Sequence, residues 1–187
     1  AFEELAEGLR QYLYESFNGE GYLRTREIRI AGWITENLLT LWRIEPARTF
    51  ETPYGRKSMG EAVRDAMQSV FDYELADGHA GFVFAGGESE ADPFLRQPLM
   101  NCYFLEPAIE AYKEMFSREP SAYSAALFAL IQRMTDWLIL VTYGGASNAG
   151  GYLPRQIPYM VDTRKPAQDE GQIPYLLMAL NAAAFLY

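Results

Sequence analysis

Apolar residues recur at helical spacing in six segments of this chain, and this periodicity constrains the fold more than any other feature of its sequence. β-Branched alternation is scarce, and the best strand candidate, Phe82–Phe84, is very short. We therefore expect an all-α protein. The six main helices are predicted over residues 2–16, 30–44, 58–75, 98–116, 121–141 and 174–187.

Local signals mark the beginning of several predicted helices. Ser58 and Glu61 have the spacing of a capping box, in which the hydroxyl and the carboxylate satisfy backbone amides reciprocally. Pro98 suits the first turn of the fourth helix. Residues 124–141 and 175–187 are apolar on nearly every side, which predicts that neighbouring helices enclose them.

The helices follow one another in a weak internal repeat. ENLLTLW at residues 36–42 aligns with EPAIEAY at 106–112, and more loosely with YLLMALN at 175–181. The offsets between these segments are 70 and 69 residues. The repeat predicts three consecutive αα-hairpins in a single all-α domain that spans residues 1–187.

A polar turn residue, glycines and an aromatic residue follow the first, third and fifth predicted helices. These loops read NGEGY at residues 18–22, DGHAGF at 77–82 and NAGGY at 148–152. In an up-and-down array they share one end, and long loops commonly carry functional residues. We therefore expect the functional site at this glycine-loop end. His79 has no counterpart in the other two loops, so we interpret it as a turn residue.

The segment EAYKEMFSREPSAYSAALFALIQRMTDWLI resembles a helical hairpin of the α/α toroid (six-hairpin glycosidase-like) superfamily, and DGHAGF is similar to its Asp-Gly-x-x-Gly-aromatic loop. The resemblance implies carbohydrate processing, since glycoside hydrolases, polysaccharide lyases and sugar epimerases use this scaffold with the substrate at the loop-lined end. Terpenoid and lanthipeptide cyclases use related toroids.

The number of helices separates this chain from a closed toroid, which needs about twice as many. We therefore expect a half or open α/α toroid, or a portion of a larger one. The chain begins and ends inside apolar helical segments. Because exposed apolar helices are a liability, we expect these flanks to pack against further helices of the same or other chains.

The formal net charge of −9 and the single cysteine exclude several kinds of function. Nucleic acids and anionic membrane surfaces both require clustered Lys and Arg, so neither is an expected partner. No apolar run is long enough to span a membrane. One Cys, Cys102, and one His cannot supply a disulfide framework or a zinc site of standard composition, so neither a metal nor a cofactor is expected.

Two aspartates are the candidate catalytic residues of a glycoside hydrolase, which needs one protonated and one ionised carboxyl group. Asp92 lies shortly before the fourth predicted helix. Asp162 lies in PYMVDTR, where apolar neighbours would raise the pKa of its carboxyl. We expect these two to form an acid/base pair. The alternative, that residues 88–92 form only a solvated acidic loop, is the more common case and stays open.

A polysaccharide lyase would instead use a tyrosine base and groups that neutralise a uronate carboxylate. Tyr159 is the candidate base, in the segment GGYLPRQIPYMVDTR. We expect further residues of this segment and of the fourth helix to bind the substrate. These are Tyr152, Arg155, Asn101, Tyr103 and Arg164.

The sequence thus predicts a carbohydrate-active protein, a glycoside hydrolase or polysaccharide lyase if it is an enzyme, with a poly- or oligosaccharide as its partner. This function favours an extracellular or periplasmic location. The alternative is a non-enzymatic structural or sugar-binding helical module that assembles through its open flanks. The 13 tyrosines would suit such an interface.

Overall fold

The structure is a computed structural model that describes residues 8, 28–52, 55–72, 95–96, 98–118, 120–143, 157–158, 161–162 and 171–187. Within this part the chain forms the helices α2 (Ile28–Ile44), α3 (Met59–Asp72), α4 (Pro98–Ala111), α5 (Ala122–Tyr143) and α6 (Ile173–Leu186). The π-helical turn η1 (Tyr112–Phe116) continues α4. The all-α prediction is confirmed for the described residues. Of the predicted helix 2–16, only Gly8 is described, and it is helical.

The capping box predicted from the sequence opens α3. The backbone N–H and the hydroxyl of Ser58 donate to Glu61 Oε2 at 2.7 and 2.8 Å. In return, the Glu61 N–H donates to Ser58 Oγ at 3.2 Å. The hydrogen bond from the Ser58 backbone holds the pKa of Glu61 below its ordinary value. This exchange satisfies amide groups that have no partner inside the first turn.

A comparable exchange opens α5, where Ser121 N–H donates to Ser124 Oγ at 2.8 Å and Ser124 N–H donates to Ser121 Oγ at 3.1 Å. The hydroxyl of Ser124 therefore takes the place of the carboxylate that a capping box usually has. Both helices thus begin where side-chain oxygens are available to the first turn.

Short strands accompany the helices. β1 (Thr49–Thr52) and β2 (Gly55–Ser58) form an antiparallel hairpin between α2 and α3, where no strand was expected from the sequence. Gly55 opens β2 with φ at 108°, a conformation that glycine adopts without steric cost. The remaining strands have two residues each: β3 (Leu95–Arg96), β4 (Ile157–Pro158), β5 (Val161–Asp162) and β6 (Gly171–Gln172). β3 pairs with β5 and β4 pairs with β6, both antiparallel.

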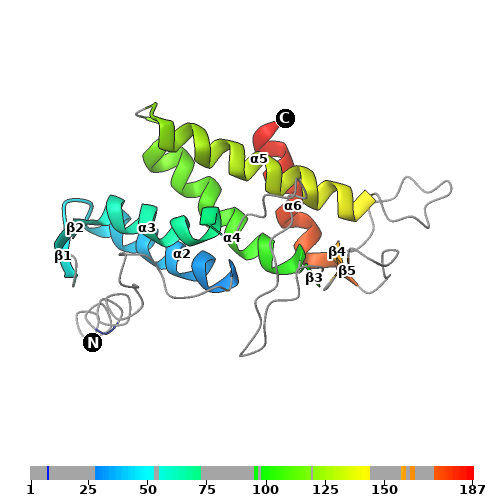
Figure 1. Cartoon of the computed structure of the whole chain (residues 1–187), viewed down its shortest axis with the longest axis horizontal. Coiled ribbons are helices and arrows are strands. Elements are labelled where there is room, and N and C mark those ends of the chain that lie inside the picture. Colours follow the sequence, from blue (N-terminus) through cyan, green and yellow to red (C-terminus); the bar gives the residue numbers. More distant parts are fainter. Residues whose placement is uncertain are drawn as a thin grey trace.

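α2, α4 and α6 run in one direction, and α3 and α5 run in the other (Figure 1). α4 lies between α2 and α6 and packs against both. Gly32, near the start of α2, faces Tyr103 near the start of α4, and Arg43 at the end of α2 reaches Glu110 near the end of α4. α3 packs on α2, and α5 packs on both α4 and α6.

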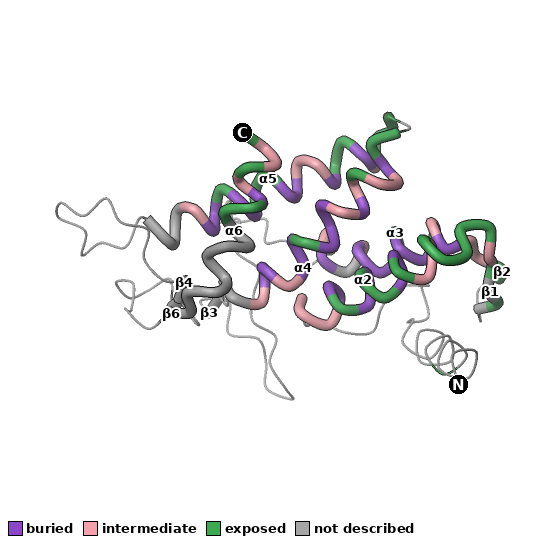
Figure 2. Tube along the Cα trace, turned by 180° about the vertical axis from the view of Figure 1, so that it is seen from behind, coloured by how far each residue is buried: buried purple, intermediate pink, exposed green. Residues whose placement is uncertain are grey.

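The hydrophobic core lies among α2, α3, α4 and α5, with Ala182 of α6 joining it. Figure 2 shows buried positions recurring along these helices between exposed ones, as amphipathic helices require. The largest fully buried side chains are Phe104, Leu38, Leu39, Met67, Leu105, Leu127, Leu130, Ile131 and Met134. The buried hydroxyls of Thr35 and Thr135 donate to carbonyl oxygens one turn earlier, each at 2.8 Å.

α2 crosses α4 at unusually close range, at Gly32. A Cβ atom on Gly32 would lie 2.7 Å from the carbonyl carbon of Tyr103 and 2.9 Å from Cα of Phe104, and closer still to the Tyr103 oxygen. Pro107 lies inside α4 and has no N–H, so it cannot donate to this Tyr103 carbonyl as an ordinary residue would. The crossing therefore requires glycine at position 32.

α5 and the end of α6, residues 180–186, are less enclosed than their apolar sequences predict. α5 exposes Gln132, Arg133 and Asp136 along one face. α6 exposes Ala184 and Leu180, and the side chain of Leu180 is 41% accessible. Among the described residues, no helix is both long enough and apolar enough to cross a bilayer.

Candidate functional site

The two-residue strands β3, β4 and β5 lie at the end of the helical array where α4 and α6 begin (Figure 1), and β6 directly precedes α6. In the β3–β5 pair, Asp162 lies opposite Leu95 and Val161 lies opposite Arg96. In the β4–β6 pair, Ile157 lies opposite Gln172. β4 also packs against α4, α5 and α6. The backbone hydrogen bonds thus connect the segment that holds the candidate catalytic residue Asp162 to the residues just before α4.

Asn101, a predicted substrate-binding residue, lies in the first turns of α4 at this end. It is 1% exposed, and neither its Nδ2 nor its Oδ1 has a hydrogen-bond partner. A buried amide without a partner costs about 1–3 kcal/mol relative to a solvated one. An unsatisfied group of this kind therefore calls for an explanation, such as a bound ligand.

Tyr103 lies two residues further along α4 and contacts α2 instead. Its ring meets that of Trp33 edge to face, with the centroids 5.9 Å apart and the planes at 71°. The guanidinium of Arg29 lies over the ring of Trp33, 5.1 Å from its centroid. Residues two apart on a helix point to different faces, so Asn101 and Tyr103 do not face the same space.

The remaining candidate residues lie wholly or partly outside the described part of the chain. The backbone of Asp162 is described, but its side chain is not. Five further candidates lie outside the described residues: Asp92, Tyr152, Arg155, Tyr159 and Arg164. Their roles stay predictions from the sequence.

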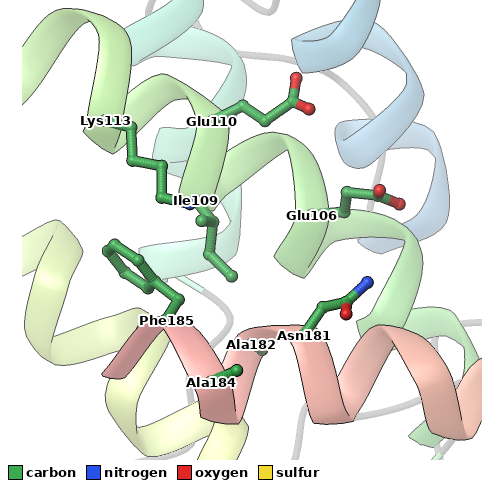
Figure 3. Close-up of a pocket in the computed structure, with 8 residues that line it drawn as sticks. All are labelled: Glu106, Ile109, Glu110, Lys113, Asn181, Ala182, Ala184 and Phe185. Carbon is green, nitrogen blue, oxygen red and sulfur yellow. The ribbon is translucent and has the colours of Figure 1, made fainter. Parts of the chain in front are cut away.

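A pocket that the sequence analysis did not anticipate lies between α4, η1 and α6 (Figure 3). Its volume is about 380 Å³. It is lined by Glu106, Ile109, Glu110, Lys113, Asn181, Ala182, Ala184 and Phe185. Pockets that hold small ligands begin at about this size.

The polar groups of the pocket fall into two sets. Glu106 and Asn181 extend from facing helices to the same side of the pocket, and neither makes a hydrogen bond or ion pair with any described residue (Figure 3). Glu110 and Lys113 are already engaged. Glu110 accepts a hydrogen bond from Arg43 of α2, and the Lys113 ammonium lies 4.8 Å from the ring centroid of Phe185.

Arg43 ties the end of α2 to this wall of the pocket. Its Nη2 lies 2.7 Å from Glu110 Oε2 and 2.6 Å from Glu114 Oε1, and its Nε donates to Glu114 Oε2 at 3.0 Å. The hydrogen bonds to Arg43 lower the pKa of Glu114, and the same bonds, first the one to Glu114, raise the pKa of Arg43. Glu114 therefore stays ionised at neutral pH, and one guanidinium holds the side chains of Glu110 and Glu114 in place.

One signal in the sequence pointed towards this pocket. Asn181 is the only amide in YLLMALNAAAFL, a segment whose other side chains, Tyr175 apart, are purely apolar. Glu106 and Glu110 are four residues apart, and so share a face of α4. No local pattern predicts that α4 packs against α6. This packing brings Glu106 and Asn181 together, although 75 positions separate them in the sequence.

Within the described residues, no group of three or more His, Cys, Asp or Glu side chains is arranged to hold a metal ion. The pocket offers hydrogen-bonding groups and apolar walls, which suit binding of an organic molecule. Comparisons of the chain with protein-family models, with curated proteins and with solved structures gave no match.

Proposed function

We propose that the chain is a carbohydrate-active protein of the α/α-toroid type, which takes a poly- or oligosaccharide at the end where α4 and α6 begin. The observation that carries this proposal is the carboxamide of Asn101, buried near that end without a partner. Saccharide hydroxyls both donate and accept hydrogen bonds. Two hydroxyl groups would therefore satisfy the nitrogen and the oxygen of this side chain.

The proposed architecture is a series of αα-hairpins, with α2, α4 and α6 as the inner helices and α3 and α5 as outer ones. It is supported by the common direction of α2, α4 and α6, and by the packing of α4 between the other two. In such an array every inner helix begins at the same end. A site built there receives residues from several hairpins.

In the hydrolytic form of the proposal, Asp92 and Asp162 form the acid/base pair. The pairing of β3 with β5 supports this assignment, because it sets Asp162 opposite Leu95, and Asp92 precedes Leu95 by three positions in the sequence. A separation of about 5–5.5 Å between the carboxyl groups would retain the anomeric configuration, and about 6.5–9.5 Å would invert it.

In the lyase form, Tyr159 removes the proton next to a uronate carboxylate that Arg155 and Arg164 neutralise. The electron pair of that C–H bond forms a C=C bond as the glycosidic C–O bond breaks, and the leaving oxygen takes up a proton. Tyr159 directly follows Pro158 of β4, and β4 packs against α4, the helix that carries Asn101. Both forms therefore draw on the same end of the array, and the substrate decides between them.

Turnover on two panels of glycans tests the catalytic residues. Release of reducing ends reports hydrolysis of neutral glycans, and absorbance of the unsaturated product reports elimination from uronate-containing ones. We expect Asp162→Asn to lower hydrolysis, or Tyr159→Phe to lower elimination, by about a hundredfold or more. Glu36→Gln, on the exposed face of α2, is the control and keeps full activity. If neither variant alters the turnover, or if neither panel is turned over, the enzymatic proposal is wrong.

Asn101→Leu tests the binding role separately. A ligand-binding amide is replaced here by an apolar side chain of similar size, so affinity for the saccharide should fall while the free energy of unfolding stays the same or rises. A residue that serves only the fold would behave in the opposite way. A loss of stability with unchanged affinity would therefore refute the role that we propose for Asn101.

The second candidate is a non-enzymatic helical module that assembles through its flanks. The exposure of large apolar side chains supports it: Trp33 is 43% accessible, Ile44 52% and Leu180 41%. Sedimentation velocity decides the matter. A monomer at all concentrations would exclude assembly, and a concentration-dependent oligomer that Leu180→Glu dissociates would support it.

A further inference from the structure

We propose that the pocket between α4, η1 and α6 is a binding site for a neutral polyhydroxylated molecule the size of one or two sugar rings. The site lies along the helices and uses none of the residues assigned to the end where α4 and α6 begin. Its volume of about 380 Å³ is at the small end of the range for ligand pockets. A polymer chain would not be enclosed there, whereas a single sugar unit would.

The hydrogen-bonding groups that are available in the pocket match hydroxyl groups. The carboxylate of Glu106 only accepts hydrogen bonds, and the carboxamide of Asn181 both donates and accepts. Neither has a partner among the described residues, and both point to one side of the pocket (Figure 3). Vicinal hydroxyls that donate to the first and exchange hydrogen bonds with the second would satisfy both.

The mixed charge of the pocket selects against strongly charged ligands. A cation would be attracted to Glu106 but repelled by the ammonium of Lys113. An anion would be attracted to Lys113 but repelled by Glu106, while Arg43 compensates the charge of Glu110. A neutral molecule with several hydroxyl groups meets neither penalty.

The walls of the pocket are held in place before any ligand arrives. Arg43 anchors Glu110 with a hydrogen bond of 2.7 Å, so Glu106 is the uncommitted carboxylate. The ring of Phe185 meets Tyr112 with centroids 6.0 Å apart and carries the Lys113 ammonium on its face. Prior ordering of these groups lowers the entropic cost of binding.

Titration of the full chain with small probes, followed by NMR, tests this site. The neutral probes are glucose, galactose and N-acetylglucosamine, and the charged probes are glucuronate and putrescine. We expect a neutral sugar to shift the amide resonances of Glu106, Lys113 and Asn181. Glu106→Gln and Asn181→Leu should each weaken binding by about tenfold or more, because each removes hydrogen bonds to the ligand. Glu36→Gln is the matched control and should bind as the wild type does.

Three results would overturn the proposal: tighter binding of putrescine or glucuronate than of every neutral sugar, unchanged affinity in both variants, or shifts confined to other residues. Circular dichroism checks that the variants fold, which their exposed positions predict. Asp162→Asn separates this site from the proposed function. It should lower hydrolysis, as Tyr159→Phe should lower elimination, and both variants should leave the titration unchanged, so either proposal can fail while the other stands.

Discussion

Replacement of Gly32 by alanine should destabilise the protein, although alanine is the better helix former. The added Cβ would lie 2.7 Å from the Tyr103 carbonyl carbon and 2.9 Å from Cα of Phe104. Ordinary contacts between carbon atoms begin at about 3.5 Å, so the shorter distance falls short by about 0.8 Å. Both neighbours are backbone atoms, so no side chain can rotate to make room.

The magnitude follows from two opposing contributions. Overpacking of a rigid contact costs about 3 kcal/mol, and the higher helix propensity of alanine returns about 1 kcal/mol. We therefore expect a net loss of about 2 kcal/mol in the free energy of unfolding. For a chain of this length that corresponds to a melting temperature lower by roughly 4–8 °C.

Gly60→Ala is the matched control. Gly60 lies in the first turn of α3, where the nearest atom to an added Cβ is the flexible Met115 Cε at 3.4 Å. This change should raise the stability by about 0.5 kcal/mol, because alanine restricts the unfolded chain. Urea unfolding followed by circular dichroism compares the two variants with the wild type. If Gly32→Ala is as stable as the wild type, α2 does not cross α4 at this point.

Three further changes probe the contacts described above. Arg43→Ala should cost about 0.5–1 kcal/mol at neutral pH, as expected for exposed ion pairs. Arg43 holds the pKa of Glu114 low, so this contribution to stability is present above the unfolded pKa of Glu114 and is lost as the pH falls through the folded pKa. Urea titrations of the wild type and the variant should therefore converge at acid pH. Ser58→Ala, which removes the hydroxyl that accepts from Glu61 N–H, should cost about 1 kcal/mol in thermal melts, and an unchanged melting temperature would contradict the capping role. Burial raises the pKa of Cys102 to about 12, so a thiol reagent at pH 8 should react only after urea is added, and rapid reaction of the native protein would show the thiol to be accessible.

The five described helices were predictable because their signals are local. Apolar spacing, the capping box at Ser58 and the proline at position 98 place the starts of α3 and α4 within about one residue of those observed. The hairpin of β1 and β2 was missed, since strands of four residues give little alternation to detect. Residues 180–186, the part of α6 whose burial is described, are not enclosed as expected, because an apolar composition does not specify which neighbours cover a helix.

The pocket depended on information that local patterns do not contain. Glu106 and Asn181 become neighbours only when α4 packs against α6. The side chain of Glu110 is held in place only by its hydrogen bond with Arg43 of α2. Such contacts depend on how the helices pack, which their individual sequences leave open. The burial of Asn101 without a partner was equally hidden, although its residue type and position had suggested a ligand.

The π-helical turn η1 makes the direction of the following chain depend on the number of residues at the end of α4. Ser117 N–H donates to the Tyr112 carbonyl, five residues earlier, at 2.8 Å, so this turn holds one residue more than an α-helical turn. Phe116, the last residue of η1, packs on Tyr123 with the ring centroids 5.0 Å apart. Deletion of one residue would rotate everything that follows by about 100° about the helix axis and separate these rings. The direction of the chain between η1 and α5 therefore depends on the number of residues in η1. Insertions and deletions change this number, whereas substitutions do not.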